Sequence, residues 1–191
     1  MALRGVLESS DQPFEIHVIG TPSEESLDGG KNEMAAHGGF DHIDVAFMVH
    51  GSTLTQLETP SLALIEMDVE FHGKTAHAGI APYAGRSAVD AVTMLQTGLG
   101  LMRNHLKDSS RVSNIVLAGG TAVNSVPDFA KVKVEIRHSS MAYLESVEQW
   151  TREIAQAAAM ATQTQVQITP VAHIYNLSLI HISEPTRHSL I

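Results

Sequence analysis

The stretch that decides the fold is Ile65-Glu66-Met67-Asp68-Val69-Glu70-Phe71-His72, in which apolar and polar side chains alternate. A period of two is typical of a strand with one buried face and one solvent face. Residues 131–137 repeat the pattern, with Val132, Val134 and Ile136 between charged side chains. Because Lys131 and Lys133 would then face the acids of 65–72, we predict that the two strands are antiparallel neighbours.

The surrounding segments complete a βαββαβ order. Residues 84–106 carry apolar side chains at three- and four-residue spacing, which predicts a helix, and 112–118 predict a strand. A second helix is predicted to begin near Ser139 or Ser140, both good N-caps, and a last strand at 165–169. This is the order of a ferredoxin-like sandwich, with the first and third strands central, the second and fourth at the edges, and two helices on one face.

The first sixty residues have a different pattern. Residues 14–20 read as a strand, 31–37 as a short helix, and 44–49 as a strand that is apolar on both faces. Such a strand is typical of a parallel sheet, so the unit is predicted to be a βαβ crossover, whose chemistry gathers at the carboxyl ends of the strands. The predicted fold class is therefore α/β for a partial domain at 1–60 and α+β for a domain at 61–171, joined by the polar stretch 51–60 and followed by a tail at 172–191.

Composition excludes several classes of protein. The 191 residues carry a formal charge of -9, which disfavours nucleic acid and anionic membranes as partners, and they contain no cysteine. Any metal must therefore bind to His, Asp or Glu. No apolar run is long enough to span a bilayer, and residues 1–11 lack the apolar core of a signal peptide, so we expect a cytoplasmic protein.

Three side chains follow the predicted strand ends of residues 1–60. Glu24 and Glu25 form either a solvated loop pair, or a base and a metal ligand beside an acidified water. His50 either caps a buried strand end or binds a metal. Their shared edge of the sheet favours the metal interpretation.

Three more candidates lie in the second domain. His77 and Asn124 lie in glycine-rich loops that either bind a substrate or only turn the chain. Arg137 is either an ion-pair partner of Glu66 or Asp68, or a clamp for a carboxylate or oxyanion.

Two groups of motifs carry a family resemblance. The first group resembles the central segment of the metal-dependent amidohydrolase and peptidase family, which includes aminoacylase, p-aminobenzoyl-glutamate hydrolase and the hydrolases of indoleacetyl amino acids. The second group is similar to that family's lid, or dimerisation, domain, and together the two cover about residues 1–171. The first comprises Gly20-Thr21-Pro22-Ser23-Glu24-Glu25, Gly29-Gly30-Lys31, Met34, Gly38, Phe40, Asp44 and Val49-His50; the second comprises His72-Gly73-Lys74-Thr75-Ala76-His77-Ala78, Pro82, Gly85-Arg86-Ser87-Ala88, Gly119-Gly120-Thr121, Asn124 and Pro127-Asp128.

The resemblance implies an activity, cofactors and a partner. The activity is metal-dependent hydrolysis of an amide bond in N-acyl amino acids or dipeptides. The cofactors are two divalent ions, zinc or manganese, and the partner is a second copy that binds through the lid.

It also implies roles for the candidates. Glu24 would be the general base, with Glu25 and His50 as metal ligands. His77 would reach the active site of a partner subunit to stabilise an oxyanion or bind the substrate carboxylate. Asn124 and Arg137 would hold that carboxylate.

The chain departs from the family at both ends. A His-x-Asp motif before the Glu-Glu segment and a last His ligand after the lid are not found, so we expect an incomplete site and a fragment that is inactive alone. Residues from about Tyr175 resemble translated sequencing-adapter read-through, or else a flexible native terminus, and we exclude His181 and His188 from any metal site. A noncatalytic dimerisation or small-ligand-binding module is the alternative function.

Overall fold

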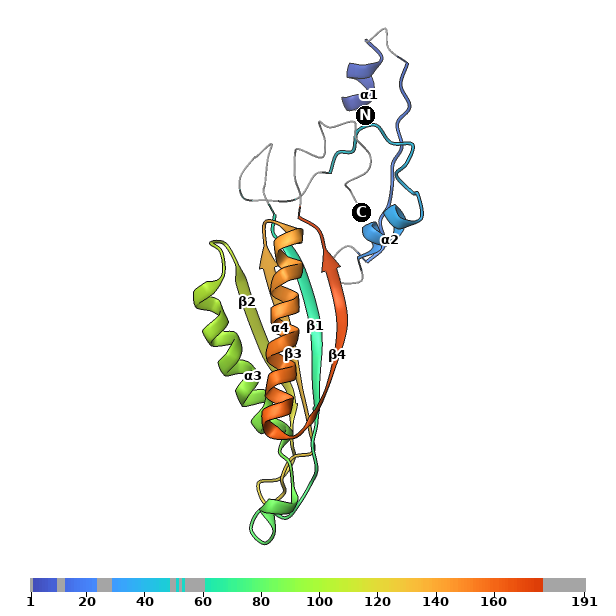
Figure 1. The fold of residues 1–191 in the computed structure, drawn as a ribbon. Coiled ribbons are helices and arrows are strands. Elements are labelled where there is room, and N and C mark those ends of the chain that lie inside the picture. Colours follow the sequence, from blue (N-terminus) through green and yellow to red (C-terminus); the bar gives the residue numbers. More distant parts are fainter. Residues whose placement is uncertain are drawn as a thin grey trace.

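The computed structural model describes residues 2–9, 13–23, 29–48, 51, 53 and 61–176. Its second half is one sheet covered by two helices (Figure 1). The sheet is antiparallel, in the order β2-β3-β1-β4, so the predicted central and edge strands are confirmed. The elements are α1 (Ala2–Leu7), α2 (Gly30–Ala36), β1 (Ala63–His72), η1 (Pro82–Ala84), α3 (Ala88–Met102), η2 (Arg103–His105), β2 (Arg111–Gly119), β3 (Phe129–His138), α4 (Met141–Thr162) and β4 (Gln165–Ile174).

The charges on the open face of the sheet fix the pairing of β1 with β3. Asp68 lies opposite Lys133, and Glu70 lies opposite Lys131. Lys131 Nζ is 2.7 Å from Asp68 and 2.9 Å from Glu70, and Lys133 Nζ is 2.6 Å from Glu66 and 3.4 Å from Asp68. The predicted charge ladder is therefore confirmed, and each acid contacts at least one of the two lysines.

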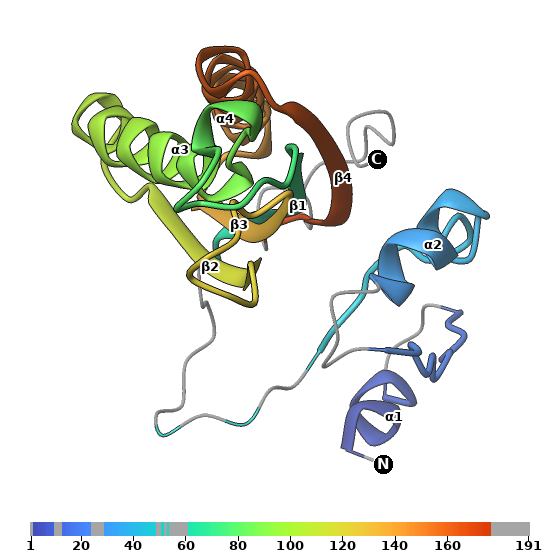
Figure 2. The ribbon, with the colours of Figure 1, turned by 90° about the horizontal axis from the view of Figure 1, so that it is seen from below.

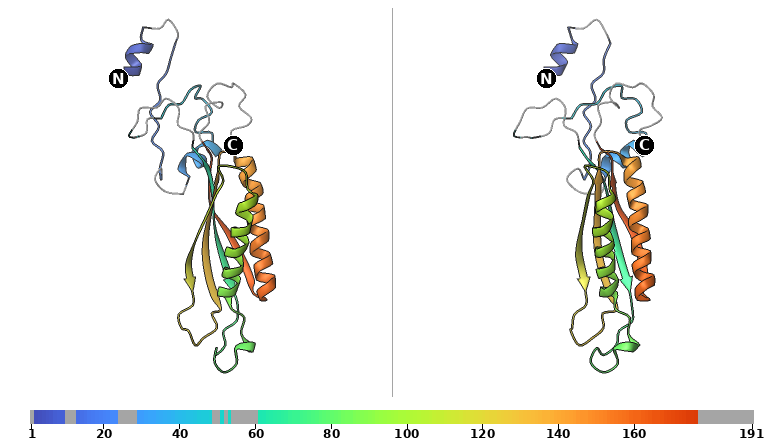
Figure 3. Two further views of the ribbon diagram at one scale, coloured as in Figure 1. Left: turned by 90° about the vertical axis from the view of Figure 1, so that its left-hand side faces the viewer. Right: turned by 60° about the vertical axis from the view of Figure 1, so that its left-hand side comes forward.

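The core lies between the other face of the sheet and the helices α3 and α4 (Figures 2 and 3). The alternate side chains of β1 and β3 are fully buried there, as the period of two predicted. The helices touch closely at Gly98, where an added Cβ would overlap Ile154 Cγ2. Full burial of each large apolar side chain contributes roughly 1.5–3 kcal/mol, so this one layer stabilises the domain.

The first long helix is shorter than predicted, because α3 occupies 88–102 rather than 84–106. Ser87 caps it, accepting a hydrogen bond from Asp90 N at 3.2 Å, while an antiparallel bridge between Lys74 and Arg86 holds the preceding backbone extended. For α4, the cap is Ser140, one of the two predicted residues, which accepts a bond from Tyr143 N at 3.4 Å.

The last strand is longer than predicted. β4 runs through Pro170 to Ile174, beyond the predicted end at residue 169. The register shifts where Pro170 lies opposite Met67, and β4 is an edge strand, so the missing N–H of proline is tolerated there.

The βαβ crossover is only partly formed. The helix is present as α2, but residues 13–23 and 43–48 contain no strand, which corrects the predicted strands at 14–20 and 44–49. Val18 is 97% exposed and Phe47 is 79% exposed. A parallel strand needs neighbours and a covering layer on each face, and the described residues supply neither. Asn32 Nδ2, on α2, donates to the His173 carbonyl of β4 at 2.7 Å.

Within the described part of the chain, the helices are all too short or too polar to cross a membrane.

Candidate functional site

Three of the predicted site residues, Glu24, Glu25 and His50, lie outside the described residues. Their predicted approach to one metal centre therefore stays a prediction. Among the residues that are described, His, Asp and Glu side chains form no group of three or more that could hold a metal ion. The described residues thus do not provide a metal site, and the predicted ligands rest on the sequence.

His77 and Asn124 are brought together at one end of the domain. The backbone of His77 bridges to Ser125, and the Ala78 N–H donates to the Asn124 carbonyl at 2.9 Å. The Val126 N–H donates to the Ala76 carbonyl at 2.8 Å. The loop after β1 and the loop before β3 therefore pair as a short ribbon, which we call the tip and define as residues 73–87 and 120–128.

Small residues allow the two loops of the tip to approach. Gly85 is buried, and an added Cβ would lie 3.0 Å from Ala76 Cβ, Lys74 O and Val126 Cβ. Gly120 has a φ of +89°, a left-handed conformation that favours glycine. The glycines quoted for the family resemblance thus have a local steric reason.

The ring of His77 is exposed and held in one orientation. Its Nδ1 accepts a hydrogen bond from the Gly79 N–H at 3.2 Å. A backbone N–H can only donate, so Nδ1 carries the lone pair, and the neutral ring carries its proton on Nε2. The Nε2–H group is left as a donor suited to a carboxylate or an oxyanion.

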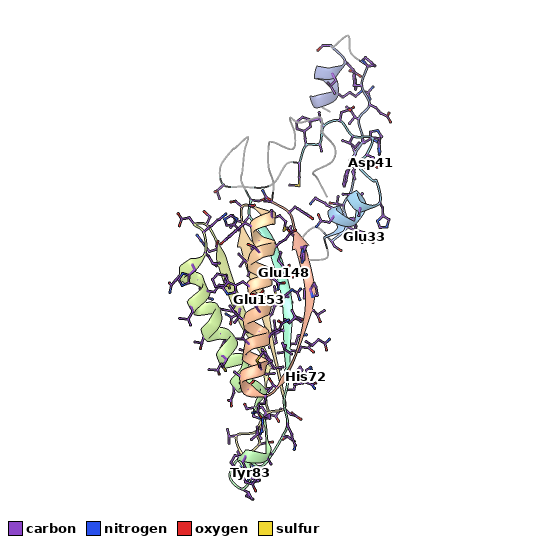
Figure 4. The ribbon with its side chains drawn as sticks, in the orientation of Figure 1. Glu33, Asp41, His72, Tyr83, Glu148 and Glu153 are labelled. Carbon is purple, nitrogen blue, oxygen red and sulfur yellow. The ribbon has the colours of Figure 1, made fainter. Side chains whose placement is uncertain are left out.

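Large apolar side chains surround this histidine on the tip. Tyr83 is 82% exposed, and Ile80 and Val123 are exposed as well. In Figure 4, Tyr83 lies at one extreme of the molecule, while Glu33 and Asp41 lie at the other. The tip therefore projects away from residues 29–48 of its own chain.

Arg137 lies at the opposite end of the sheet from the tip. It pairs with Leu64 at the start of β1, whereas Phe129, at the tip end of β3, pairs with His72. Eight residues of strand separate Arg137 from Phe129, about 27 Å at the usual rise. Asn124 and Arg137 of one chain therefore cannot bind the same small carboxylate.

The guanidinium of Arg137 is already paired. Its Nε and Nη2 donate to the two carboxylate oxygens of Glu135 at 2.7 and 3.0 Å. The predicted ion-pair partners were Glu66 or Asp68, but those acids contact the lysines of β3 instead. The hydrogen bonds from Arg137 to Glu135 hold the pKa of the guanidinium above its usual range.

Residues 63–163, which include the tip and Arg137, match the family model of the peptidase dimerisation domain of M20 peptidases. The chain belongs to this family. The lid predicted from the sequence is therefore an M20 peptidase dimerisation domain, and the enzymes of this family are generally metal-dependent.

Named relatives of this M20 domain are hydrolases. The Xaa-Arg dipeptidase of Mus musculus is 34% identical over 177 residues, which cover 92% of this chain and 41% of the relative. One of the two kinds of subunit of the p-aminobenzoyl-glutamate hydrolase of Escherichia coli is 33% identical over 169 residues, covering 87% and 35%. The crystal structure of the aminobenzoyl-glutamate utilization protein of Klebsiella pneumoniae superposes with a TM-score of 0.57 at 30% identity, covering 61% of this chain and 30% of that one. The chain thus spans about two fifths or less of the length of these relatives.

Two features of the M20 domain were missed by the sequence reasoning. Glu135 was not predicted as the partner of Arg137, although residues two apart on a strand share a face. The exposed Ile80, Tyr83 and Val123 were not singled out either. Their signal was available, since apolar residues in glycine-rich loops have no core to enter.

The charge ladder of the M20 domain shifts the pKa values of its members. Burial opposes ionisation of Asp68, but hydrogen bonding to Lys131 and the charges of both lysines outweigh it and lower the pKa of the carboxyl. Hydrogen bonds to the acids raise the pKa of Lys131 and of Lys133. The ladder is therefore fully charged at neutral pH.

Proposed function

We propose that this chain is the lid-bearing part of a hydrolase that cleaves an amide bond in N-acyl amino acids or dipeptides and works as a homodimer. The observation that carries the proposal is the tip, where His77 and Asn124 are exposed at the end of the domain farthest from residues 29–48. The names of the relatives, a dipeptidase and an aminobenzoyl-glutamate hydrolase, support the substrate class.

The two edges of the sheet differ as surfaces for a second copy. On β2, Ile115, Val116 and Leu117 are 59%, 44% and 50% exposed. The β4 edge carries glutamines, a threonine and Pro170, together with a register shift, which are features that protect an edge from pairing. The β2 edge is therefore the one suited to association.

The helix next to β2 extends this surface. Met94 and Leu101 of α3 are exposed although α3 is otherwise well buried against the core. A two-fold contact that pairs β2 with β2 of the partner would bring the two copies of α3 together as well. Apolar area from both layers would then be removed from water.

This pairing also determines where the tip lies in the dimer. β2 runs from Arg111, at the end of the sheet near Arg137, to Gly119, next to the tip. Two-fold pairing of β2 is antiparallel, so the tip of one copy lies beside the Arg111 end of the other. Residues 29–48 of the partner lie at that same end (Figures 1 and 4).

Each active site would then be shared between two chains. We place His77 and Asn124 of one copy with Arg137 of the other, which removes the conflict over the distance between Asn124 and Arg137. The His77 Nε2–H would donate to the carbonyl oxygen as negative charge develops there. Arg137 would exchange Glu135 for the substrate carboxylate, and the amide of Asn124 would donate to it.

The remaining roles rest on the sequence and the family. Glu24 would take a proton from the attacking water, and Glu25 and His50 would hold divalent ions, zinc or manganese, two in the whole site. Such ions, when bound, acidify a water and polarise the carbonyl. A cytoplasmic location also stays a prediction from composition.

A domain exchange tests the proposal. Residues 63–163 would replace the corresponding domain of the mouse Xaa-Arg dipeptidase, and dipeptide hydrolysis would be measured with added zinc or manganese. We expect the chimaera to be active and its His77→Ala variant to lose activity by about 10²-fold or more, as when an oxyanion donor is removed.

A mixing experiment then asks whether the site is shared. The His77→Ala chimaera would be combined with a chimaera that lacks the dipeptidase's own general base. Recovered activity in the mixture is expected, because one of the two sites in the heterodimer is intact. An active chimaera that is indifferent to His77→Ala would instead favour a noncatalytic dimerisation or ligand-binding module.

A further inference from the structure

Most of the ion-paired cations of the domain lie on the sheet, but three unpaired cations gather elsewhere. Lys131, Lys133, Arg137 and Arg152 each contact a carboxylate. Arg103, Lys107 and Arg111 form no ion pair with any carboxylate of the described residues, and they line one open pocket of ≈ 430 Å³ between α3 and β2. In a chain with a formal charge of -9, this local excess of positive charge requires an explanation.

Neutral groups hold all three cations in place. Arg103 donates through Nε and Nη2 to the Val112 carbonyl at 3.2 and 2.8 Å. Arg111 donates through Nη1 to the Ser110 carbonyl at 2.8 Å, and Lys107 Nζ lies 4.5 Å from the centre of the Tyr143 ring. Each charge is positioned but not neutralised.

The loop that carries the cations is itself fixed. The Lys107 N–H donates to Tyr143 Oη at 2.9 Å, and Ser110 Oγ donates to the Lys107 carbonyl at 2.7 Å. Ser109 has a φ of +68°, which turns the chain sharply between Lys107 and Arg111. The loop therefore presents its cations in a preformed arrangement, with little ordering required on binding.

We propose that this pocket binds a small dianionic oxyanion of the phosphate type. The lining carries three cations and one carboxylate, that of Asp108, for a net charge of +2 that a dianion would balance. Two guanidinium groups and an ammonium supply donors from three side chains, and guanidinium forks match the oxygens of phosphate. The inference does not rest on the proposed function, since none of these residues is assigned to hydrolysis.

Amide chemical shifts of the ¹⁵N-labelled 191-residue chain would be followed during titration with inorganic phosphate at pH 7.5, with ionic strength held constant by sodium chloride. We expect saturable shifts centred on residues 103–112. Parallel titrations with sulfate and succinate separate a tetrahedral oxyanion from a dicarboxylate, and tighter binding of succinate than of phosphate would overturn the assignment.

Two variants with opposite expected effects make the test specific. Arg111→Gln removes an exposed cation and should weaken binding about tenfold, while Asp108→Asn removes the one repelling charge and should strengthen binding about threefold or more. Lys74→Gln is the matched control, because it removes one positive charge on the tip, outside the pocket, and should leave the affinity unchanged. Shifts that do not saturate, or equal weakening by Arg111→Gln and Lys74→Gln, would show that only the overall charge attracts the anion.

Discussion

The backbone of His77 forms an isolated antiparallel bridge with that of Ser125, and this one pairing joins the two loops of the tip. Thr75 Oγ1 and Ser125 Oγ lie 2.9 Å apart and add a side-chain hydrogen bond between the same loops. Because both loops leave the central strands β1 and β3, the tip is an extension of the sheet. A histidine and an asparagine from distant parts of the sequence are thereby fixed side by side.

The contact between α3 and α4 can be tested with two glycines of one helix. Gly98→Ala places a methyl group against Ile154 and should destabilise the domain by roughly 1–2 kcal/mol, since overpacking outweighs the gain in helix propensity. Gly100→Ala meets nothing within 4 Å and should stabilise it by about 0.5–1 kcal/mol. Urea unfolding of both variants measures the two signs, and an equal gain from both would show that the helices are farther apart.

The charge ladder should make stability depend on pH through Asp68. Its pKa in the folded chain is lowered below 3.8, so its ionised form contributes stability above its unfolded pKa, and that contribution is lost as pH falls through the folded pKa. Asp68→Asn should therefore cost about 1 kcal/mol at pH 7 and progressively less below pH 4.

Unfolding of wild type and Asp68→Asn at several pH values measures this convergence. Glu145→Gln, which changes an exposed acid on α4, is the control and should give a small difference in stability at pH 7. A cost of Asp68→Asn that stays constant down to pH 3 would contradict the ladder.

The domain should fold without the segment before it. The buried apolar cluster is drawn from residues 63–159, and β4 completes the sheet at Ile174. We expect residues 61–176 to show a cooperative thermal transition by circular dichroism. We expect residues 1–60 alone to show none, because a short helix with exposed apolar segments cannot bury a core. A noncooperative melt of 61–176 would mean that the earlier segment is part of the folding unit.

Local patterns predicted the domain well where they recorded burial directly. The alternation around Met67 and Val69 fixed β1, and the charges of Lys131 and Lys133 fixed its neighbour. Features set by distant contacts were missed. The extended backbone at Arg86 depends on its bridge to Lys74, and the continuation of β4 through Pro170 depends on its being an edge strand.

The candidate site was predictable in composition but less so in arrangement. The motifs selected His77 and Asn124, and the structure brings them together. The separation of Arg137 from them follows from the direction of β3, which no motif records. Glu24, Glu25 and His50 lie outside the described residues, and the strands expected to align them need a sheet that residues 13–23 and 43–48 do not form.

The central claim is that two copies pair through β2, and the absence of cysteine from the chain allows a direct measurement. Single cysteines would be introduced at Ser113, Ile115 or Leu117 on β2 and, as matched controls, at Gln167, Thr169 or Val171 on β4. Antiparallel two-fold pairing brings a residue near the axis within disulfide distance of its own copy. We predict that oxidation cross-links at least one β2 variant into a dimer and none of the β4 variants. Cross-linking only on β4, or on neither edge at a concentration where the chain sediments as a dimer, would contradict the β2 interface and the shared site built on it.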